Sequence, residues 1–114
     1  LNFVMQNPNL PDDLIPYWDF DAPNIPNEPR DASSAACIAS ALYEMNNYLP
    51  DNGYTSLADR IICSLSSPEY RAPLGKNGCF LLMHSVGSIP HNNEIDVPLN
   101  YADYYFLEAL TRRK

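Results

Sequence analysis

The chain has 114 residues, enough for one compact domain, and 46% of them are apolar, so a buried core can form. Its formal net charge is −7, from 14 acidic and 7 basic residues. A nucleic-acid partner requires a cationic surface, so this charge argues against nucleic-acid binding. The one basic cluster, Arg112-Arg113-Lys114, suits the C-terminal end of a helix instead.

The sequence also limits membrane and metal partners. No apolar run is long enough to cross a bilayer, so we expect no membrane partner, and a cytoplasmic and a periplasmic location both stay open. Cys37, Cys63 and Cys79 form no C-x-x-C or Cys/His pattern, so we expect no zinc site and no cofactor. We expect buried thiols at Cys37 and Cys63, which fall on apolar helical stripes, and no disulfide framework, although one bridge stays open.

The first 30 residues predict little regular structure. The opening LNFVMQ resembles the end of a helix, which Asn7, Pro8 and Pro11 then stop, and we therefore expect the chain to be part of a longer protein. Residues 7–30 predict a loop rich in Pro, Asn and Asp that contains the aromatic and acidic run YWDFD at 17–21. A loop of this length in a small domain is often functional.

Residues 32–48 predict a helix. Asp31 is a suitable N-cap, because its carboxylate can accept the free amide hydrogens of the first turn. One face carries apolar residues at helical spacing: Ala35, Ala36, Ala39, Leu42 and Tyr43. Because this face is small, we expect a helix from outside the chain to pack closely against it.

A second helix is predicted over residues 57–66. Ser56 and Asp59 resemble a capping box, and Pro68 ends the element. The helix carries a clean apolar stripe: Leu57, Ala58, Ile61, Ile62 and Leu65. Residues 69–98 read as irregular, with a short strand or an extended buried run over 79–83 and a polar, turn-rich loop from His84 onward.

The last predicted helix covers residues 101–113, with Asn100 as its cap. Aromatic and aliphatic residues surround most of it, so we expect it to be buried on several sides. Three helices cannot cover all of these faces among themselves. The pattern of helical hairpins and long loops predicts an all-α toroid or solenoid, and the isolated chain is expected to be marginally stable or to self-associate.

Three motifs, in this order, resemble the C-terminal segment of unsaturated glucuronyl hydrolases, glycoside hydrolase family 88. They are YWDFDAP at 17–23, RDASSAA at 30–36 and NYADYYFLEAL at 100–110, where Ala102 stands at a position at which Gly is commoner in the family. The resemblance covers nearly the whole chain. It implies an (α/α)6 toroid of six-hairpin glycosidase type, with residues 1–114 as the C-terminal part of one catalytic domain.

The family resemblance also implies a function. Its members act on lyase products that carry a 4,5-unsaturated uronic acid at the non-reducing end, by hydration of the double bond. An aspartic acid protonates the carbon, water adds at the neighbouring position, and the resulting hemiketal opens and releases the remaining sugar. The catalytic aspartates of the family lie in earlier hairpins, so we expect none here and no turnover by the isolated chain. The alternatives are an unsaturated rhamnogalacturonyl hydrolase and a non-catalytic helical carbohydrate-binding or scaffold module.

The candidate site residues of this chain are therefore substrate-binding residues. Tyr17 and Trp18 suit sugar stacking, and we expect one of the two to lie near substrate and the other in the core. For His84 a loop-fixing and a substrate-facing role both stay open, and Ser85 follows it. Some relatives carry a sulfate-binding Ser-x-x-Ser-x-Lys loop, and at those places this chain has Ser88, His91 and Asn93, without the lysine.

For three other polar residues we expect structural roles. Asp19 and Asp21 point to opposite sides of an extended segment, so we expect one of them to fix the loop as a hydrogen-bond acceptor. Arg30 could pair with a uronate carboxylate, but we expect it to tie the loop to the start of the helix at residue 32.

Overall fold

The computed structural model describes residues 2–50, 53–73, 75, 77–87 and 95–113. The described part is all-helical, as predicted, with helices α1 (Asn2–Met5), α2 (Ala32–Tyr48), α3 (Tyr54–Leu65) and α4 (Asn100–Arg112) and the 3-10 turn Asn77–Cys79. Within these ranges, β pairing is limited to the isolated bridges Tyr17–Arg30, Arg71–Leu82 and Ser85–Val97. The extended stretch before Met83 therefore forms one bridge and no strand.

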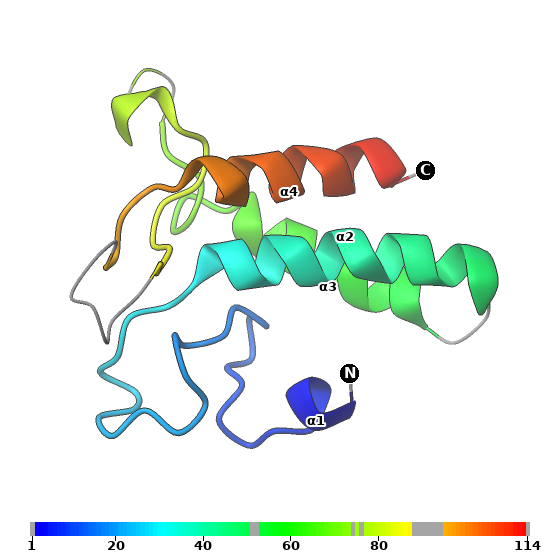
Figure 1. Ribbon diagram of the computed structural model, residues 1–114, viewed down its shortest axis with the longest axis horizontal. Coiled ribbons are helices and arrows are strands. Elements are labelled where there is room, and N and C mark those ends of the chain that lie inside the picture. Colours follow the sequence, from blue (N-terminus) through cyan, green and yellow to red (C-terminus); the bar gives the residue numbers. More distant parts are fainter. Residues whose placement is uncertain (1, 51–52, 74, 76, 88–94, 114) are drawn as a thin grey trace.

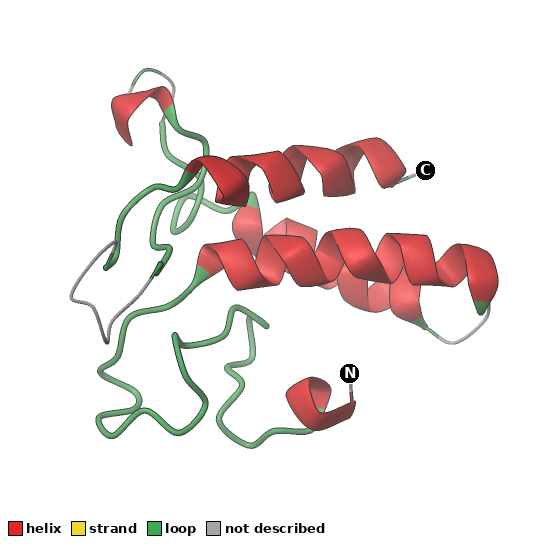
Figure 2. Cartoon of the chain, in the orientation of Figure 1, coloured by secondary structure: helices red, strands yellow, loops and turns green. Residues whose placement is uncertain are grey.

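Helix α2 lies at the centre of the fold. Helix α3 runs back along one side of it, and α4 packs on another side in the same direction as α2 (Figures 1 and 2). Because α2 and α4 are parallel, both begin at the same end of the molecule. The loops that carry the described candidate site residues, Tyr17, Trp18, His84 and Ser85, lie near that end. No helix in the described ranges has the length and apolar character needed to span a bilayer.

Helix α2 begins and packs largely as its sequence predicts. The Asp31 carboxylate accepts a hydrogen bond from the Ser33 amide, which confirms the N-cap. Its small-residue face is fully buried at Ala35, Ala36 and Ala39. The expectation that this face waits for a helix outside the chain is wrong, because α3 and α4 already cover it.

Helix α3 begins earlier than predicted. Gly53, at φ 76°, is its N-cap and offers no side-chain cap, so Ser56 lies inside the helix and the predicted capping box is wrong. The carboxylate of Asp59 accepts instead from the hydroxyl of Tyr43 at 2.6 Å and from Nε of Arg113 at 3.1 Å. The predicted apolar stripe is confirmed by the buried positions Ala58, Ile61, Ile62 and Leu65.

Helix α4 begins one residue before the prediction, with Leu99 as its N-cap and no side-chain cap, so the expected Asn100 cap is wrong. Asp103, in the first turn, accepts from the backbone amides of Leu81 at 2.8 Å and Leu82 at 3.0 Å. This carboxylate thereby joins the 80–83 segment to α4.

The faces of α4 differ sharply in burial. Ala102, Phe106 and Ala109 are buried against α2, whereas Tyr104 is 57% and Leu107 50% exposed. Burial on several sides is therefore not achieved within the described chain, in keeping with the prediction that its helices cannot cover every apolar face.

The predicted burial of the cysteines on α2 and α3 is wrong. Cys37 and Cys63 are exposed and carry free thiols. Each follows a buried residue, Ala36 and Ile62 respectively, and one position along a helix turns a side chain by about 100°, away from the core. Helical periodicity predicts both cysteines on apolar stripes, but the buried faces of α2 and α3 do not extend to them.

Candidate functional site

The Asp31 carboxylate organises the end of the fold where α2 begins. It accepts hydrogen bonds from the Ser33 amide at 3.1 Å, the Ser33 hydroxyl at 2.5 Å and the Ser34 hydroxyl at 2.7 Å. It also accepts from the amide of Val86 at 3.2 Å, from a segment far away in sequence. Since Asp31 is only 8% exposed, one buried side chain caps α2 and attaches the loop of the candidate site to it.

Arg30 forms a second junction. Its Nη1 lies 2.9 Å and 3.1 Å from the two carboxylate oxygens of Asp13, 3.1 Å from the carbonyl of Ile15 and 2.9 Å from the hydroxyl of Tyr70. The guanidinium also lies 4.8 Å from the ring centroid of Tyr17. Arg30 thus holds the loop, as expected, although its partners are the 13–17 segment and Tyr70 and not the start of α2.

Tyr70 takes part in this junction as a neutral phenol. Burial, followed by the charge of Asp13, raises the pKa of Tyr70 above its ordinary value. The protonated hydroxyl donates to Asp13 at 3.0 Å while it accepts from Arg30. These contacts fix the position of Tyr70, which borders two surface cavities.

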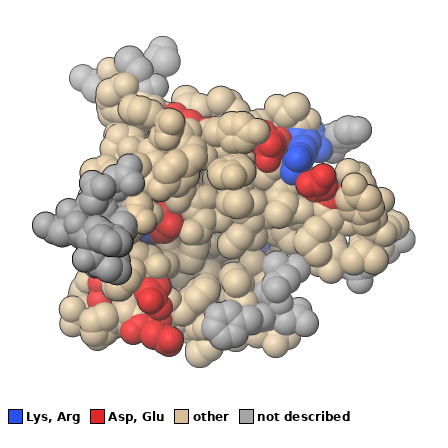
Figure 3. Space-filling model, in the orientation of Figure 1, with Lys and Arg blue, Asp and Glu red and all other residues tan. Residues whose placement is uncertain are grey.

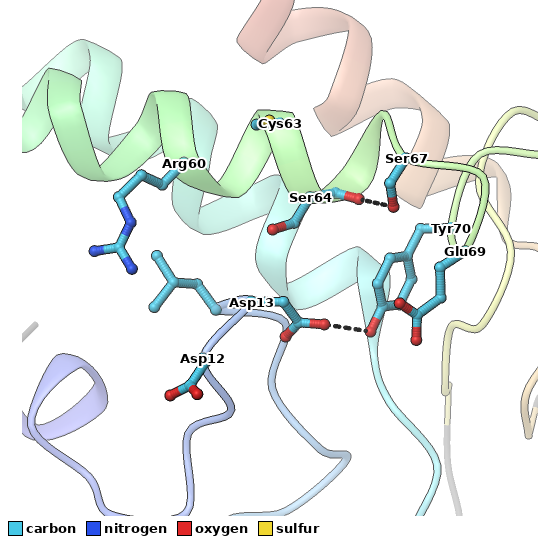
Figure 4. A pocket seen from close by; sticks show the side chains of 9 residues that line it. Asp12, Asp13, Arg60, Cys63, Ser64, Ser67, Glu69 and Tyr70 are labelled. Atoms are coloured by element: carbon cyan, nitrogen blue, oxygen red, sulfur yellow. Dashed lines mark hydrogen bonds between the residues drawn. The ribbon is translucent and has the colours of Figure 1, made fainter.

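The larger cavity, of about 350 Å³, lies between the 12–14 segment and the outer side of α3 (Figure 4). Arg60 and Cys63 line it from the helix, and Asp12 lines it from the loop opposite. The Asp13–Tyr70 hydrogen bond forms part of its wall. The cavity thus lies along the flank of the hairpin and is bordered by residues of both charge signs.

The smaller cavity, of about 230 Å³, also borders Tyr70 and is lined by Glu28, Pro29, Arg30, Glu69, Tyr70, His84 and Asp96. His84 Nδ1 lies 2.6 Å from Asp96 Oδ1, and the His84 ring meets the Tyr70 ring edge-on, with centroids 6.0 Å apart. Within the described ranges, no group of three His, Cys, Asp or Glu side chains is placed to hold a metal ion.

Known proteins similar to this chain share both its sequence and its fold. No protein-family model matches it. An unsaturated glucuronyl hydrolase of Formosa agariphila is 47% identical over 112 residues, which are 98% of this chain and 28% of that protein. A solved unsaturated glucuronyl hydrolase specific for heparin is 52% identical, with a TM-score of 0.94 over 98% of this chain and 30% of that one.

The chain belongs to the unsaturated glucuronyl hydrolase family. It corresponds to a C-terminal segment and spans less than a third of the length of these relatives. The solved unsaturated glucuronyl hydrolases are α/α toroids, which confirms the predicted fold class. A mutant unsaturated glucuronyl hydrolase of Streptococcus agalactiae was solved in complex with dGlcA-GalNAc6S. It is 33% identical to this chain, with a TM-score of 0.81 over 91% of this chain and 29% of that one.

The predicted site residues differ in how far they are buried. Tyr17 is buried beneath Arg30, so it is the core member of the aromatic pair. Trp18 is half-buried, and its Nε1 donates to Glu28 Oε1 at 3.0 Å, beside the smaller cavity. The Ser85 hydroxyl is fully buried and has no partner among the described groups, a position that disfavours contact with substrate.

The remaining predicted residues of this chain have separate outcomes. Asp19 accepts from the Asp21 amide at 2.8 Å, which confirms a loop-fixing role for one of the two aspartates. Ser88, His91 and Asn93 lie outside the described residues. Sequence reasoning missed Asp96 as the partner of His84, since a separation of 12 positions in sequence conceals that the Ser85–Val97 bridge brings the two together.

Proposed function

We propose that the protein containing this chain hydrolyses oligosaccharides that carry a 4,5-unsaturated glucuronic acid at the non-reducing end. One observation carries the proposal: 52% identity and a TM-score of 0.94, over 98% of the chain, to the heparin-specific hydrolase. The saccharide complex of the S. agalactiae relative supports an unsaturated uronic-acid oligosaccharide as the partner. In this proposal, residues 1–114 form the C-terminal part of a single toroid domain.

The proposed reaction is hydration of the double bond. A carboxylic acid protonates one carbon, water adds to the next, and the hemiketal so formed opens and releases the rest of the saccharide. This chain would supply toroid wall and the loops beside the bound sugar, with Trp18 and His84 as the described candidates for contact.

We propose that the acid itself lies elsewhere in the protein, because the well-placed carboxylates here act as acceptors. Asp31 accepts from amide and hydroxyl groups, Asp103 accepts from two amides, and Asp13 pairs with Arg30. A general acid must donate a proton to the substrate, so a carboxyl that accepts structural hydrogen bonds is poorly suited to that role.

The test is an assay of the full-length protein on the unsaturated disaccharides that heparin, chondroitin and pectin lyases release. The reaction is monitored by the loss of the ultraviolet absorbance of the double bond. We expect turnover of a glucuronyl product by the full-length protein and none by residues 1–114 alone. Turnover of the pectin product alone would replace the proposal with a rhamnogalacturonyl hydrolase. Binding without turnover of any product would replace it with a non-catalytic carbohydrate-binding module.

A further inference from the structure

The His84–Asp96 pair beside the smaller cavity is costly to build and contributes little to folding. Both residues have positive backbone φ angles, 65° and 53°, a strained region for residues other than glycine. Their side chains are 41% and 53% exposed, and an ion pair or hydrogen bond in such a position adds little stability. Strain of this kind at an exposed polar pair is typical of residues held in place for binding.

The surrounding structure restrains His84 through its backbone and its ring. The carbonyl of His84 accepts from the Ala32 amide at 2.9 Å, at the start of α2. The next residue exchanges two hydrogen bonds with Val97, each 3.0 Å long, and the ring edge rests on Tyr70. Backbone and ring are thus anchored from three directions.

Asp96 sets which nitrogen of His84 is available. A carboxylate only accepts, so the short contact assigns the proton to Nδ1 of His84. In the neutral ring, Nε2 is then a hydrogen-bond acceptor, and no described group is its partner. A sugar hydroxyl is a suitable donor for such a nitrogen.

The charges around the cavity select against an anion. Among the described residues that line it, the three carboxylates of Glu28, Glu69 and Asp96 stand against one guanidinium, that of Arg30. Asp13 already balances that guanidinium at 2.9 Å. On the face drawn in Figure 3, acidic side chains likewise gather over the loops below α2, and the basic side chains that stand out lie near the end of α4. A sulfate or uronate group would meet net repulsion here, whereas hydroxyls can donate to the carboxylates.

We infer that this cavity is a subsite for an uncharged, unsulfated sugar on the leaving-group side of the substrate, in which Asp96 orients His84 and Nε2 of His84 accepts a hydrogen bond from a sugar hydroxyl. The inference rests on the proposed function and adds to it the position and charge preference of one sugar. The unsaturated uronate carries a carboxylate and binds elsewhere, so the sugar in this cavity is its neighbour.

The test uses the full-length protein with His84→Ala and Asp96→Asn. The control is Asp59→Asn, which also alters a carboxylate with a 2.6 Å hydrogen bond but lies on α3, outside both cavities. With an unsulfated unsaturated disaccharide, KM should rise about tenfold for His84→Ala and about threefold for Asp96→Asn, with kcat within about twofold, since the contact is remote from the double bond. Unchanged KM values, or a fall in kcat alone, would overturn the inference.

The charge preference has its own test. Glu69→Lys should shift the ratio of kcat/KM for sulfated over unsulfated disaccharides toward the sulfated one by about fivefold or more. A ratio that stays constant would refute the charge argument.

Calorimetric titration with the unsulfated disaccharide separates this inference from the proposed function. If the wild-type protein turns over no unsaturated substrate, the proposed function fails, and the titration still tests the subsite. Weaker binding by His84→Ala than by wild type or by Asp59→Asn would support the subsite, and equal affinities would overturn it.

Discussion

Replacement of Asp31 tests whether one carboxylate both caps α2 and holds the candidate site loop. Asp31→Ala removes the acceptor of the Ser33 amide and of the Val86 amide, together with those of the two serine hydroxyls. Asp31→Asn keeps one carbonyl oxygen for the amides and loses the charge. The two variants therefore separate the acceptor from its charge.

The magnitude follows from the two amides. Loss of an N-cap side chain costs about 1 kcal/mol, and a buried amide left without an acceptor costs about 1–3 kcal/mol. Val86 is itself buried, so water cannot readily replace the lost oxygen. We expect Asp31→Ala to lower the free energy of unfolding by about 2–4 kcal/mol, and Asp31→Asn by about 1 kcal/mol.

The assay is urea unfolding of the full-length protein, combined with hydrogen exchange at the amides of Ser33 and Val86. Both amides should lose protection together in Asp31→Ala. The control is Asp21→Ala in the exposed loop, where we expect a change within about 0.5 kcal/mol. A cost for Asp31→Ala no greater than that for the control, or loss of protection at Ser33 alone, would refute the reasoning.

Three further predictions concern α4. Asp103→Asn should speed hydrogen exchange at the amide of Leu81 or Leu82 and lower the free energy of unfolding by about 1–2 kcal/mol, because the asparagine side chain has one acceptor oxygen where the carboxylate has two. Unchanged exchange at both amides would contradict this. The hydroxyl of Ser40, followed by that of Tyr104 and the charge of Arg112, lowers the pKa of Glu108 below its ordinary value of 4.5. A lowered pKa in the folded state means that the ionised Glu108 stabilises the fold above about pH 4.5, and that this stabilisation is lost as the pH falls through the folded pKa. Glu108→Gln should therefore flatten the acid limb of a plot of Tm against pH. A limb as steep as that of wild type would argue against the Ser40 contact. Isolated residues 1–114 should self-associate through the exposed side of α4, and Leu107→Gln with Leu110→Gln should reduce the association in sedimentation; a monomeric wild-type chain at every concentration would rule this out.

Part of the candidate site was predictable because it depends on local chemistry. Trp18 and His84 stand out in the sequence as an aromatic platform and a titratable side chain in a turn-rich loop, and the structure brings both to the margin of the smaller cavity. Their partners were not predictable. Glu28 and Asp96 look like ordinary loop acids until the chain folds back and places them within hydrogen-bond distance.

Errors at helix ends have the same origin. Ser56 and Asn100 are good capping residues in isolation, yet α3 begins at Tyr54 and α4 at Asn100 itself. The acid of the supposed capping box, Asp59, instead accepts from Tyr43 on α2 and from Arg113, the C-cap of α4. Tertiary partners outcompete a local cap when they offer a charged or buried contact.

The sequence by itself determined the helices, the Asp31 cap and the family, because periodicity, capping chemistry and motif order are written in neighbouring residues. Only the tertiary structure decided which apolar faces are covered. The alanine face of α2 is buried inside the chain while Tyr104 and Leu107 remain exposed, since burial depends on how α3 and α4 pack around α2. It likewise decided that Arg30, Asp13 and Tyr70 meet, because such contacts join segments that local sequence cannot relate.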